Sequence, residues 1–523
     1  MRMSVAQVAD AVEGGMVAPT DVDAEATFAD AAVSDSRQAT DGSVFVAIVG
    51  ERVDGHDFVS AAARQGAVAA IVEHEVECAG LIQIVVDDAV RALGRLAKRN
   101  LELRRAAAGE FSIIGITGSV GKTTTKDMLA SMLAHLGSVV APVGSFNNEI
   151  GLPLTALKVG EGTRFLVAEM GANHIGEIAG LTAIAPPDVA VVLKVGVAHL
   201  GEFGGVEHIA QAKSEIVRGL VPGGTAVLNA CDGHVAAMAS IAPGKVVRFG
   251  LEGEVIDGAT LDVSASGVET DGLDRPRFTM TMRGTGSEAL PVALSIPGAH
   301  NVMNALAAAS VASLMGMTPA AIAEALKDVA RISPHRMAIG KVEREGAEFT
   351  LIDDSFNANP DSMRAGLDGL ARWAGSGSDA DDAKPFRVAV LGAMLELGGD
   401  ETTLHAAIGR DAAELGLDAI VAVGSPDDLH FDALAAALAS GASDAAAANG
   451  HAEIVHAHDI DETDRHVLEL ARKHPHTVVL LKGSHASGLN ALAERWVPSA
   501  RTEATHVANP CAPATVTETE GER

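Results

Sequence analysis

The stretch from Phe111 to Leu129, FSIIGITGSVGKTTTKDML, constrains the fold of this chain more than any other. An apolar, β-prone run ends in a glycine-rich loop, and Lys122 with three threonines follows before a helical pattern begins. This order predicts a strand, a phosphate-binding loop and a helix. The working pattern is G-x-x-G-K-T, because Ile116 stands where the general pattern has its first glycine. A glycine-rich turn before an ordinary helix is the alternative.

The predicted loop has the chemistry to bind the phosphates of a nucleotide. Backbone N–H groups of such a loop converge on an anion at a helix N-terminus, which is partially positive. We expect the Lys122 ammonium to reach the β- and γ-phosphates of ATP and the Thr123 hydroxyl to hold Mg²⁺. The expected ATP-binding residues of the loop are Gly118, Ser119, Val120, Gly121, Lys122, Thr123 and Thr124.

The length of 523 residues is too great for a single core and predicts about three domains. Strands alternate with helical patterns throughout, so the expected fold class is α/β. We expect a small N-terminal α/β domain at 1–108, a central P-loop domain with a parallel sheet at 109–332, and a C-terminal Rossmann-like, doubly wound domain at 333–497. A surface loop at 374–384 and a disordered tail at 498–523 complete the expected organisation.

Charge, apolar runs and cysteine spacing indicate the cellular environment of the protein and the classes of partner that we do not expect it to bind. The formal charge of −30 argues against non-specific nucleic-acid binding. No apolar run reaches the ~18 residues that a membrane span needs, and the N-terminus lacks the apolar core of a signal peptide. Cys78, Cys231 and Cys511 have no metal-ligand spacing, so we read them as reduced thiols. We therefore expect a cytoplasmic protein with neither nucleic-acid partner nor integral membrane segment.

Polar residues follow several of the expected strands of the central domain. Glu169 ends the strand Phe165–Glu169, and His199 lies beyond the strand Val189–Leu193. Ligands bind at the carboxyl ends of the strands in a parallel sheet, so Glu169 can reach a magnesium ion beside the loop. A following helix carries Lys213. Taken singly, these residues could be a helix cap, a loop histidine and a solvated lysine.

The third domain repeats this arrangement. Its expected strands are Phe349–Asp353, Phe386–Leu391, Ala419–Val423 and Thr477–Leu481. The polar residues that follow these strands, and that we expect at one edge of the sheet, are Asp354, Asn357, Asn359, Glu396 and Lys482.

Four motifs, SFNNEIGLP, EMGANHIGEI, DDSFNANPDSM and LGAMLELG, are more specific than the phosphate loop alone. With them, residues 30 to 490 resemble the Mur ligase family of peptidoglycan synthesis. The resemblance implies an ATP-dependent ligase that uses ATP and Mg²⁺ and forms an amide bond through an acyl phosphate. The implied substrates are UDP-N-acetylmuramoyl-tripeptide and D-alanyl-D-alanine, and we expect a monomer. Diaminopimelate and lysine both stay open as the third residue of the peptide.

The same resemblance implies roles for individual residues. The implied catalytic residues are Lys122, Glu169, His199 and Lys213, and the implied metal ligands are Thr123, Glu169, His199 and Lys213. Asn301 and Asn304 would contact adenine, although capping is the usual role of such amides; Arg336 would contact the γ-phosphate and Asp354 the ribose. The implied substrate-binding residues are Ser36, Arg37, Asp54, His56, Asn147, Asn148, Asn357, Asn359, Glu396 and Lys482. His485 departs from the arginine usual in the family.

Two hypotheses and two alternatives accompany this interpretation. An ammonium at Lys213 would repel a nearby magnesium ion, so we expect this lysine to be carbamylated by CO₂. Because ligands lie on all three domains, we expect hinges near residues 108 and 332. A folylpolyglutamate-synthase-like ligase and a regulatory ATP-binding module are the alternatives. The N-terminal SDSR motif and NANPDS argue against the first, and the full set of expected ligands argues against the second.

Overall fold

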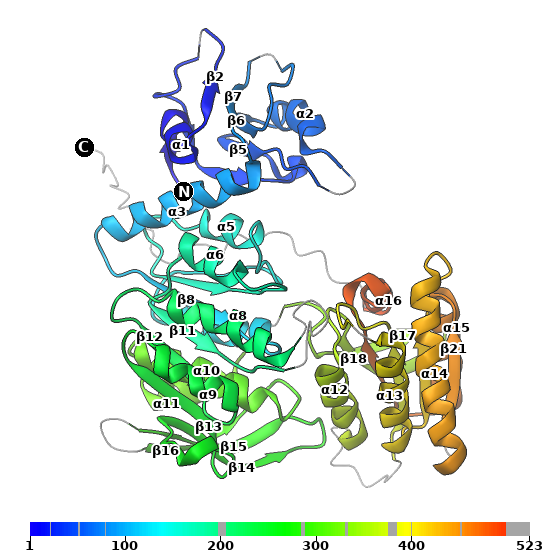
Figure 1. Cartoon of the computed structure of the whole chain (residues 1–523). Helices are drawn as coiled ribbons and strands as arrows, with labels where there is room; N and C mark the ends of the chain where they lie inside the picture. The colour runs from blue at the N-terminus through cyan, green and yellow to red at the C-terminus, as the bar shows by residue number, and fades with distance from the viewer. Residues whose placement is uncertain are drawn as a thin grey trace, which may run out of the picture.

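The described residues form three large β-sheets, each with its own helices, in three successive regions, and one additional two-stranded sheet near the N-terminus (Figure 1). The computed structural model describes residues 1–20, 22–50, 53–78, 80–196, 205–283, 288–329, 333–374, 384–398, 400–449 and 452–497. The predicted three-domain α/β class is confirmed. Residue His199, most of the expected surface loop and the C-terminal tail lie outside the described residues.

The N-terminal region has a five-stranded sheet with the order β2-β7-β6-β5-β4, in which only β2 runs antiparallel to its neighbour. Its strands are β2 (Gly15–Val17), β4 (Ala31–Val33), β5 (Ser43–Val46), β6 (Ala67–Val72) and β7 (Ile82–Val85), with a separate pair β1 (Met3–Ser4) and β3 (Phe28–Ala29). Its helices are α1 (Val5–Val12), α2 (Val59–Arg64) and α3 (Ala89–Ala106), with 3-10 turns η1 (Ser36–Gln38) and η2 (Gly55–Phe58).

The central region has a nine-stranded sheet with the order β16-β15-β14-β13-β12-β11-β8-β10-β9, parallel from β9 to β14. Its strands are β8 (Ser112–Thr117), β9 (Val139–Val140), β10 (Phe165–Glu169), β11 (Val189–Val192), β12 (Thr225–Asn229), β13 (Val246–Leu251), β14 (Val263–Thr270), β15 (Pro276–Met282) and β16 (Glu288–Ala293). One face of the sheet packs on α4 (Lys122–Leu133), α10 (Asn301–Leu314) and α11 (Pro319–Lys327). The other packs on α5 (Gly151–Ala156), α6 (Glu177–Ile184), α8 (Val206–Arg218) and α9 (Gly233–Ala237).

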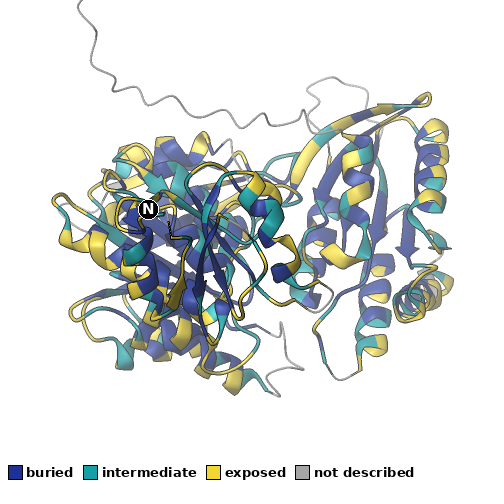
Figure 2. Ribbon diagram, turned by 90° about the horizontal axis from the view of Figure 1, so that it is seen from above, coloured by how far each residue is buried: buried dark blue, intermediate teal, exposed yellow. Residues whose placement is uncertain are grey.

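The C-terminal region is a six-stranded sheet with the order β17-β18-β22-β19-β20-β21, parallel except for β17. Its strands are β17 (Ala338–Arg344), β18 (Ala347–Asp354), β19 (Phe386–Leu391), β20 (Ala419–Val423), β21 (Glu453–Ala457) and β22 (Thr477–Lys482). Helices α12 (Pro360–Arg372), α13 (Glu401–Glu414) and α14 (Leu429–Asn449) cover one face, and α15 (Ile460–Lys473) and α16 (Leu489–Trp496) the other. Figure 2 shows the buried strands between helices whose outer faces are exposed.

Helix α3 joins the N-terminal and central regions into one continuous hydrophobic core (Figure 1). The buried Asn100 amide donates to the carbonyls of Ala156 and Val159, both at 3.0 Å, and the Arg104 Nε donates to Thr163 at 2.9 Å. A rotation at residue 108 would break these bonds and expose apolar surface, which is costly. These contacts argue against the predicted hinge near 108, whereas a hinge near 332 stays a prediction.

Candidate active site

The phosphate loop leaves the sheet at the carboxyl end of β8, which lies between β11 and β10. Gly121 caps α4 with φ +85° in the left-handed region, where glycine is favoured. A Cβ added there would lie 2.3 Å from the Asn304 Oδ1 on α10. Both the backbone angle and the close approach therefore require glycine at this position.

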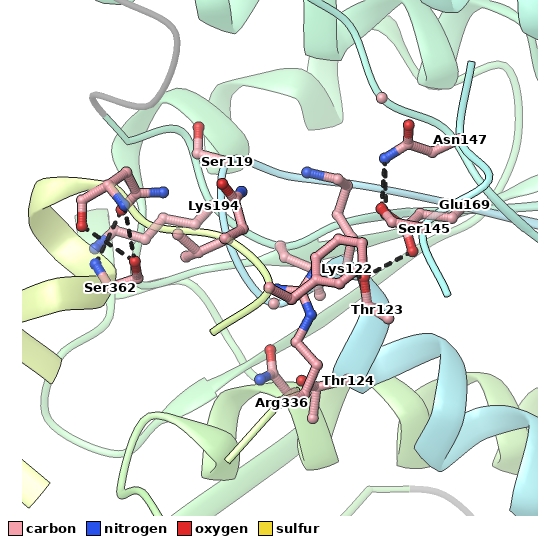
Figure 3. Close-up of a pocket in the computed structure, with 18 of the residues that line it drawn as sticks. Ser119, Lys122, Thr123, Thr124, Ser145, Asn147, Glu169, Lys194, Arg336 and Ser362 are labelled. Carbon is pink, nitrogen blue, oxygen red and sulfur yellow. Dashed lines mark hydrogen bonds between the residues drawn. The ribbon is translucent and has the colours of Figure 1, made fainter. Parts of the chain in front are cut away.

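The Glu169 carboxylate lies beside the phosphate loop and accepts hydrogen bonds from three neighbouring side chains (Figure 3). It is fully buried, and it accepts a 2.9 Å hydrogen bond from the Thr123 hydroxyl. It also accepts bonds of 2.7 Å from Ser145 and 2.9 Å from the Asn147 amide. A carboxylate and hydroxyls are the hard oxygen ligands that Mg²⁺ prefers, so the donor set fits this ion.

Two lysines line the same cavity, Lys122 partly buried and Lys213 buried. The Lys122 Nζ donates to the Gly118 carbonyl at 2.8 Å, and burial lowers the pKa of Lys122, although the Glu169 charge opposes the shift. Burial, and secondly the charge of Lys122, lower the pKa of Lys213 to about 7. Within the described part of the chain, the Lys213 side chain has neither a hydrogen-bond nor an ion-pair partner. The interior therefore favours the neutral amine of Lys213.

A cavity of about 990 Å³ opens between the central and C-terminal regions. Most of the residues predicted for ATP, metal and peptide line it: Ser119, Val120, Gly121, Lys122, Thr123, Thr124, Asn147, Asn148, Glu169, Lys213, Asn301, Asn304, Arg336, Asp354, Asn357, Asn359, Glu396 and Lys482. Its size suits a nucleotide together with part of a second substrate. Gly118 and His485 do not line it.

Arg336 reaches the phosphate loop from the C-terminal side of the cavity (Figure 3). One guanidinium nitrogen lies 3.3 Å from the Thr123 hydroxyl, and the guanidinium lies 4.4 Å from the centre of the Phe356 ring. Its Nε is buried without a hydrogen-bond partner among the described residues. An unpaired buried donor beside a phosphate loop fits an anionic ligand.

The two predicted adenine contacts are buried at the start of α10. The Asn301 amide donates to the Pro297 carbonyl at 2.7 Å, and the Asn304 amide donates to the Asn301 Oδ1 at 2.8 Å. The Asn304 Oδ1 also accepts from the Thr125 hydroxyl at 3.3 Å. Neither side chain caps the helix, so the alternative of simple capping is wrong.

The predicted residues of the C-terminal region interact with one another. Asp354 forms an ion pair with Lys482. The Lys482 side chain is buried, and its Nζ also lies 3.4 Å from the Asn357 carbonyl oxygen. The Asn359 side chain caps α12 by accepting from the Ser362 amide at 2.9 Å. Asn359 therefore has a structural role as well as its place on the cavity.

The predicted sugar-nucleotide residues lie apart from this cavity, in the N-terminal region. Ser36 is buried, whereas Arg37 is exposed and paired with Asp35 at 2.7 Å. The His56 ring is buried; its Nδ1 lies 2.6 Å from the Asp54 carboxylate, and its Nε2 accepts from the Glu73 amide at 2.9 Å. Both ring nitrogens of His56 are thus occupied, Nδ1 within its own loop and Nε2 by the residue that follows β6.

The sequence prediction missed several residues that shape the cavity. The buried Lys126 ammonium donates to the carbonyls of Pro142 at 2.7 Å and Gly144 at 3.0 Å, which fixes the loop before Ser145. Lys194 lies 3.9 Å from Asp361 and so links the central and C-terminal regions. Neither lysine was predicted as a site residue. The only signal in the sequence was the position of each: Lys126 lies four residues after Lys122, and Lys194 directly follows the expected strand Val189–Leu193.

The fold and the cavity define a class: a three-domain nucleotide-binding enzyme with its phosphate loop facing a second α/β domain. Comparison with known families identifies the class further. The Mur ligase family, catalytic domain matches residues 33–104, the Mur ligase middle domain matches 116–312, and the Mur ligase, glutamate ligase domain matches 335–485. The chain belongs to the Mur ligase family.

Individual relatives cover almost the whole chain. It is 41% identical to UDP-N-acetylmuramoyl-tripeptide--D-alanyl-D-alanine ligase of Mycobacterium tuberculosis, over 95% of this chain and 98% of that protein. A crystal structure of MurF from Acinetobacter baumannii is 32% identical, with a TM-score of 0.77 over 95% of this chain and 99% of that one. The MurF ligase of Thermotoga maritima in complex with ADP is 27% identical, with a TM-score of 0.68 over 89% and 96%.

Proposed function

We propose that the chain is the ATP-dependent ligase that joins D-alanyl-D-alanine to UDP-N-acetylmuramoyl-tripeptide in peptidoglycan synthesis. The observation that carries the proposal is the single cavity in which the phosphate loop, Glu169 and the Asp354–Lys482 pair face one another. The identity to ligases of this specificity, over nearly the full chain, supports the substrates. Within the described residues no helix is long and apolar enough to cross a membrane.

The first chemical step activates a carboxylate. An oxygen of the C-terminal carboxylate of the tripeptide attacks the γ-phosphorus of ATP, the bond to ADP breaks, and an acyl phosphate forms. Lys122 and Arg336 would stabilise the charge of the transferred group, because both present cationic donors to the loop. Asn301 and Asn304 would contact the adenine, and Asp354 the ribose.

The second step forms the amide bond. The amine of D-alanyl-D-alanine attacks the acyl carbon, a tetrahedral intermediate forms, and phosphate leaves as the C–O bond breaks. Asn357, Asn359, Glu396 and Lys482 would position the peptide and dipeptide around this carbon. Closure about residue 332 would exclude the water that otherwise hydrolyses the acyl phosphate.

Thr123 and Glu169 would hold Mg²⁺, with the predicted ligand His199 and a carbamylated Lys213 at a second ion. When bound, Mg²⁺ neutralises charge on the phosphates. The neutral Lys213 amine favoured by its burial supports carbamylation. We infer a cytoplasmic monomer, in which the N-terminal residues Ser36, Arg37, Asp54 and His56 face the uridine-diphosphate sugar.

Phosphate release tests the proposal. We expect ATP turnover only when UDP-N-acetylmuramoyl-tripeptide and D-alanyl-D-alanine are both present, and we expect Lys122→Ala to lower kcat by several orders of magnitude. Equal turnover without either substrate would support a regulatory ATPase instead. Turnover with a folate and glutamate would support the folylpolyglutamate-synthase-like alternative.

A further inference from the structure

A cluster of two histidines and one carboxylate lies on the C-terminal region. The Asp432 Oδ1 on α14 is 3.1 Å from the His456 Nε2 and 2.8 Å from the His458 Nδ1. His456 is in β21 and His458 follows it, so this i, i+2 spacing directs both rings to one side of the strand. One atom from each side chain lies within 4.8 Å of the others. Three potential metal ligands therefore converge on one point.

The surrounding backbone holds this geometry. Gly424, directly after β20, leaves room for the carboxylate, because a Cβ there would lie 2.4 Å from the Asp432 Oδ1. On the other side, the His458 amide donates to Glu462 at 2.9 Å, and Asp459 caps α15. Contacts outside the cluster thus hold the two segments that carry the three side chains, α14 with Asp432 and the end of β21 with His456 and His458.

We propose that Asp432, His456 and His458 bind one Zn²⁺ ion, with water completing a tetrahedral site. Imidazole and carboxylate ligands suit zinc and neighbouring transition metals, whereas Mg²⁺ prefers oxygen alone. Ligand atoms of a tetrahedral zinc site lie about 3.4 Å apart, given bonds of about 2.0–2.1 Å. The two carboxylate–imidazole separations of 3.1 and 2.8 Å need to widen by about 0.3 and 0.6 Å, and the two imidazole nitrogens lie within 4.8 Å of each other. None of the three residues lines the catalytic cavity.

The bound ion would join the start of α14 to the turn between β21 and α15. Among the strands that the structure describes, β21 is the outer strand of its sheet and pairs with β20 alone. A metal bridge here would hold this edge strand to the helix that packs over it. Zn²⁺ is therefore a structural ligand of the C-terminal region, distinct from the Mg²⁺ of the reaction.

The test uses the full-length enzyme in saturating Mg²⁺, titrated with Zn²⁺ against a chromophoric zinc indicator. The variants are His456→Gln and His458→Gln, and the matched control is His430→Gln. His430 lies on α14, the helix that carries Asp432, but its Nε2 pairs with Glu401 at 2.9 Å and not with Asp432. We expect the wild type and the control to bind one more Zn²⁺ than either variant, or to bind it at least about tenfold more tightly.

Two further measurements separate metal binding from a folding defect. Without Zn²⁺, the far-UV circular dichroism and ligase activity of His458→Gln should equal those of the wild type, because this side chain is more than half exposed and lies off the catalytic cavity. With Zn²⁺, Tm should rise in the wild type and in the control but not in either variant. Equal Zn²⁺ affinity and stoichiometry in all four proteins would overturn the proposal.

Discussion

The carbamylation of Lys213 gives the sharpest chemical prediction. Burial, and secondly the Lys122 charge, lower its pKa to about 7. At pH 7.5 about three-quarters of such side chains are neutral amines, compared with about one in a thousand for an ordinary lysine with a pKa of 10.5. The reaction with CO₂ forms a C–N bond and releases a proton. It needs the neutral amine, so burial increases the reactive fraction several hundredfold.

The assay is ¹³C NMR of the full-length enzyme in labelled bicarbonate. We expect one carbamate signal at pH 7.5 that declines as the pH falls below 7, because protonation removes the reactive amine. Lys213→Met preserves the length of the side chain and should abolish the signal. Lys126→Met is the matched control: Lys126 is equally buried, but carbonyl oxygens hold its ammonium, so removing it should leave the signal unchanged.

Activity provides the second readout for Lys213. Lys213→Ala should be nearly inactive and should recover partly in acetate, whose carboxylate can replace the carbamate oxygens. The reasoning fails if the wild type shows no carbamate signal in saturating bicarbonate. It also fails if Lys213→Ala remains fully active.

Three other substitutions test particular contacts. Gly121→Ala places a methyl group on a residue with φ +85°, 2.3 Å from the Asn304 Oδ1 of α10. ADP affinity measured by calorimetry should therefore fall at least about tenfold. Unchanged affinity would contradict the loop geometry. Arg372→Ala leaves the buried Asp274 carboxylate without its partner at 3.0 Å, so the free energy of unfolding, measured in urea, should fall by about 2 kcal/mol. A change within about 0.5 kcal/mol would show that the pair contributes little. Lys126→Met frees the loop at 142–145 and should lower kcat about tenfold or more while circular dichroism stays the same; an unchanged kcat would show that this lysine does not position the site.

Buried strands were predictable because both of their faces are covered, which makes them continuous apolar runs. Phe165–Glu169, Phe386–Leu391 and Ala419–Val423 have the predicted bounds. The parallel order of such strands then places the residues that follow them at one edge. That is why Glu169 could be expected beside the phosphate loop and Lys482 beside Asp354, each at the carboxyl end of its own sheet. That these two edges line one cavity depends on how the two sheets are placed, which the strand order does not determine.

Long-range pairing between charged side chains was not predictable. Arg372 at the end of α12 pairs with Asp274 in the turn between β14 and β15, 98 positions earlier. Each residue alone has the pattern of a solvated charge, and their pairing depends on how the central and C-terminal regions pack together. Lys126 was missed for a different reason: besides the adjacent Asp127 and the distant Ser333, its partners are the carbonyl oxygens of Pro142 and Gly144, which no side-chain pattern reveals.

The most direct test of the proposed reaction follows an oxygen atom. UDP-N-acetylmuramoyl-tripeptide labelled with ¹⁸O in its C-terminal carboxylate is incubated with ATP, Mg²⁺, D-alanyl-D-alanine and the enzyme, and the released phosphate is analysed by mass spectrometry. Activation through an acyl phosphate predicts that each phosphate carries one ¹⁸O atom and that one amide bond forms per phosphate. Unlabelled phosphate alongside amide product, or phosphate without product, would contradict the account.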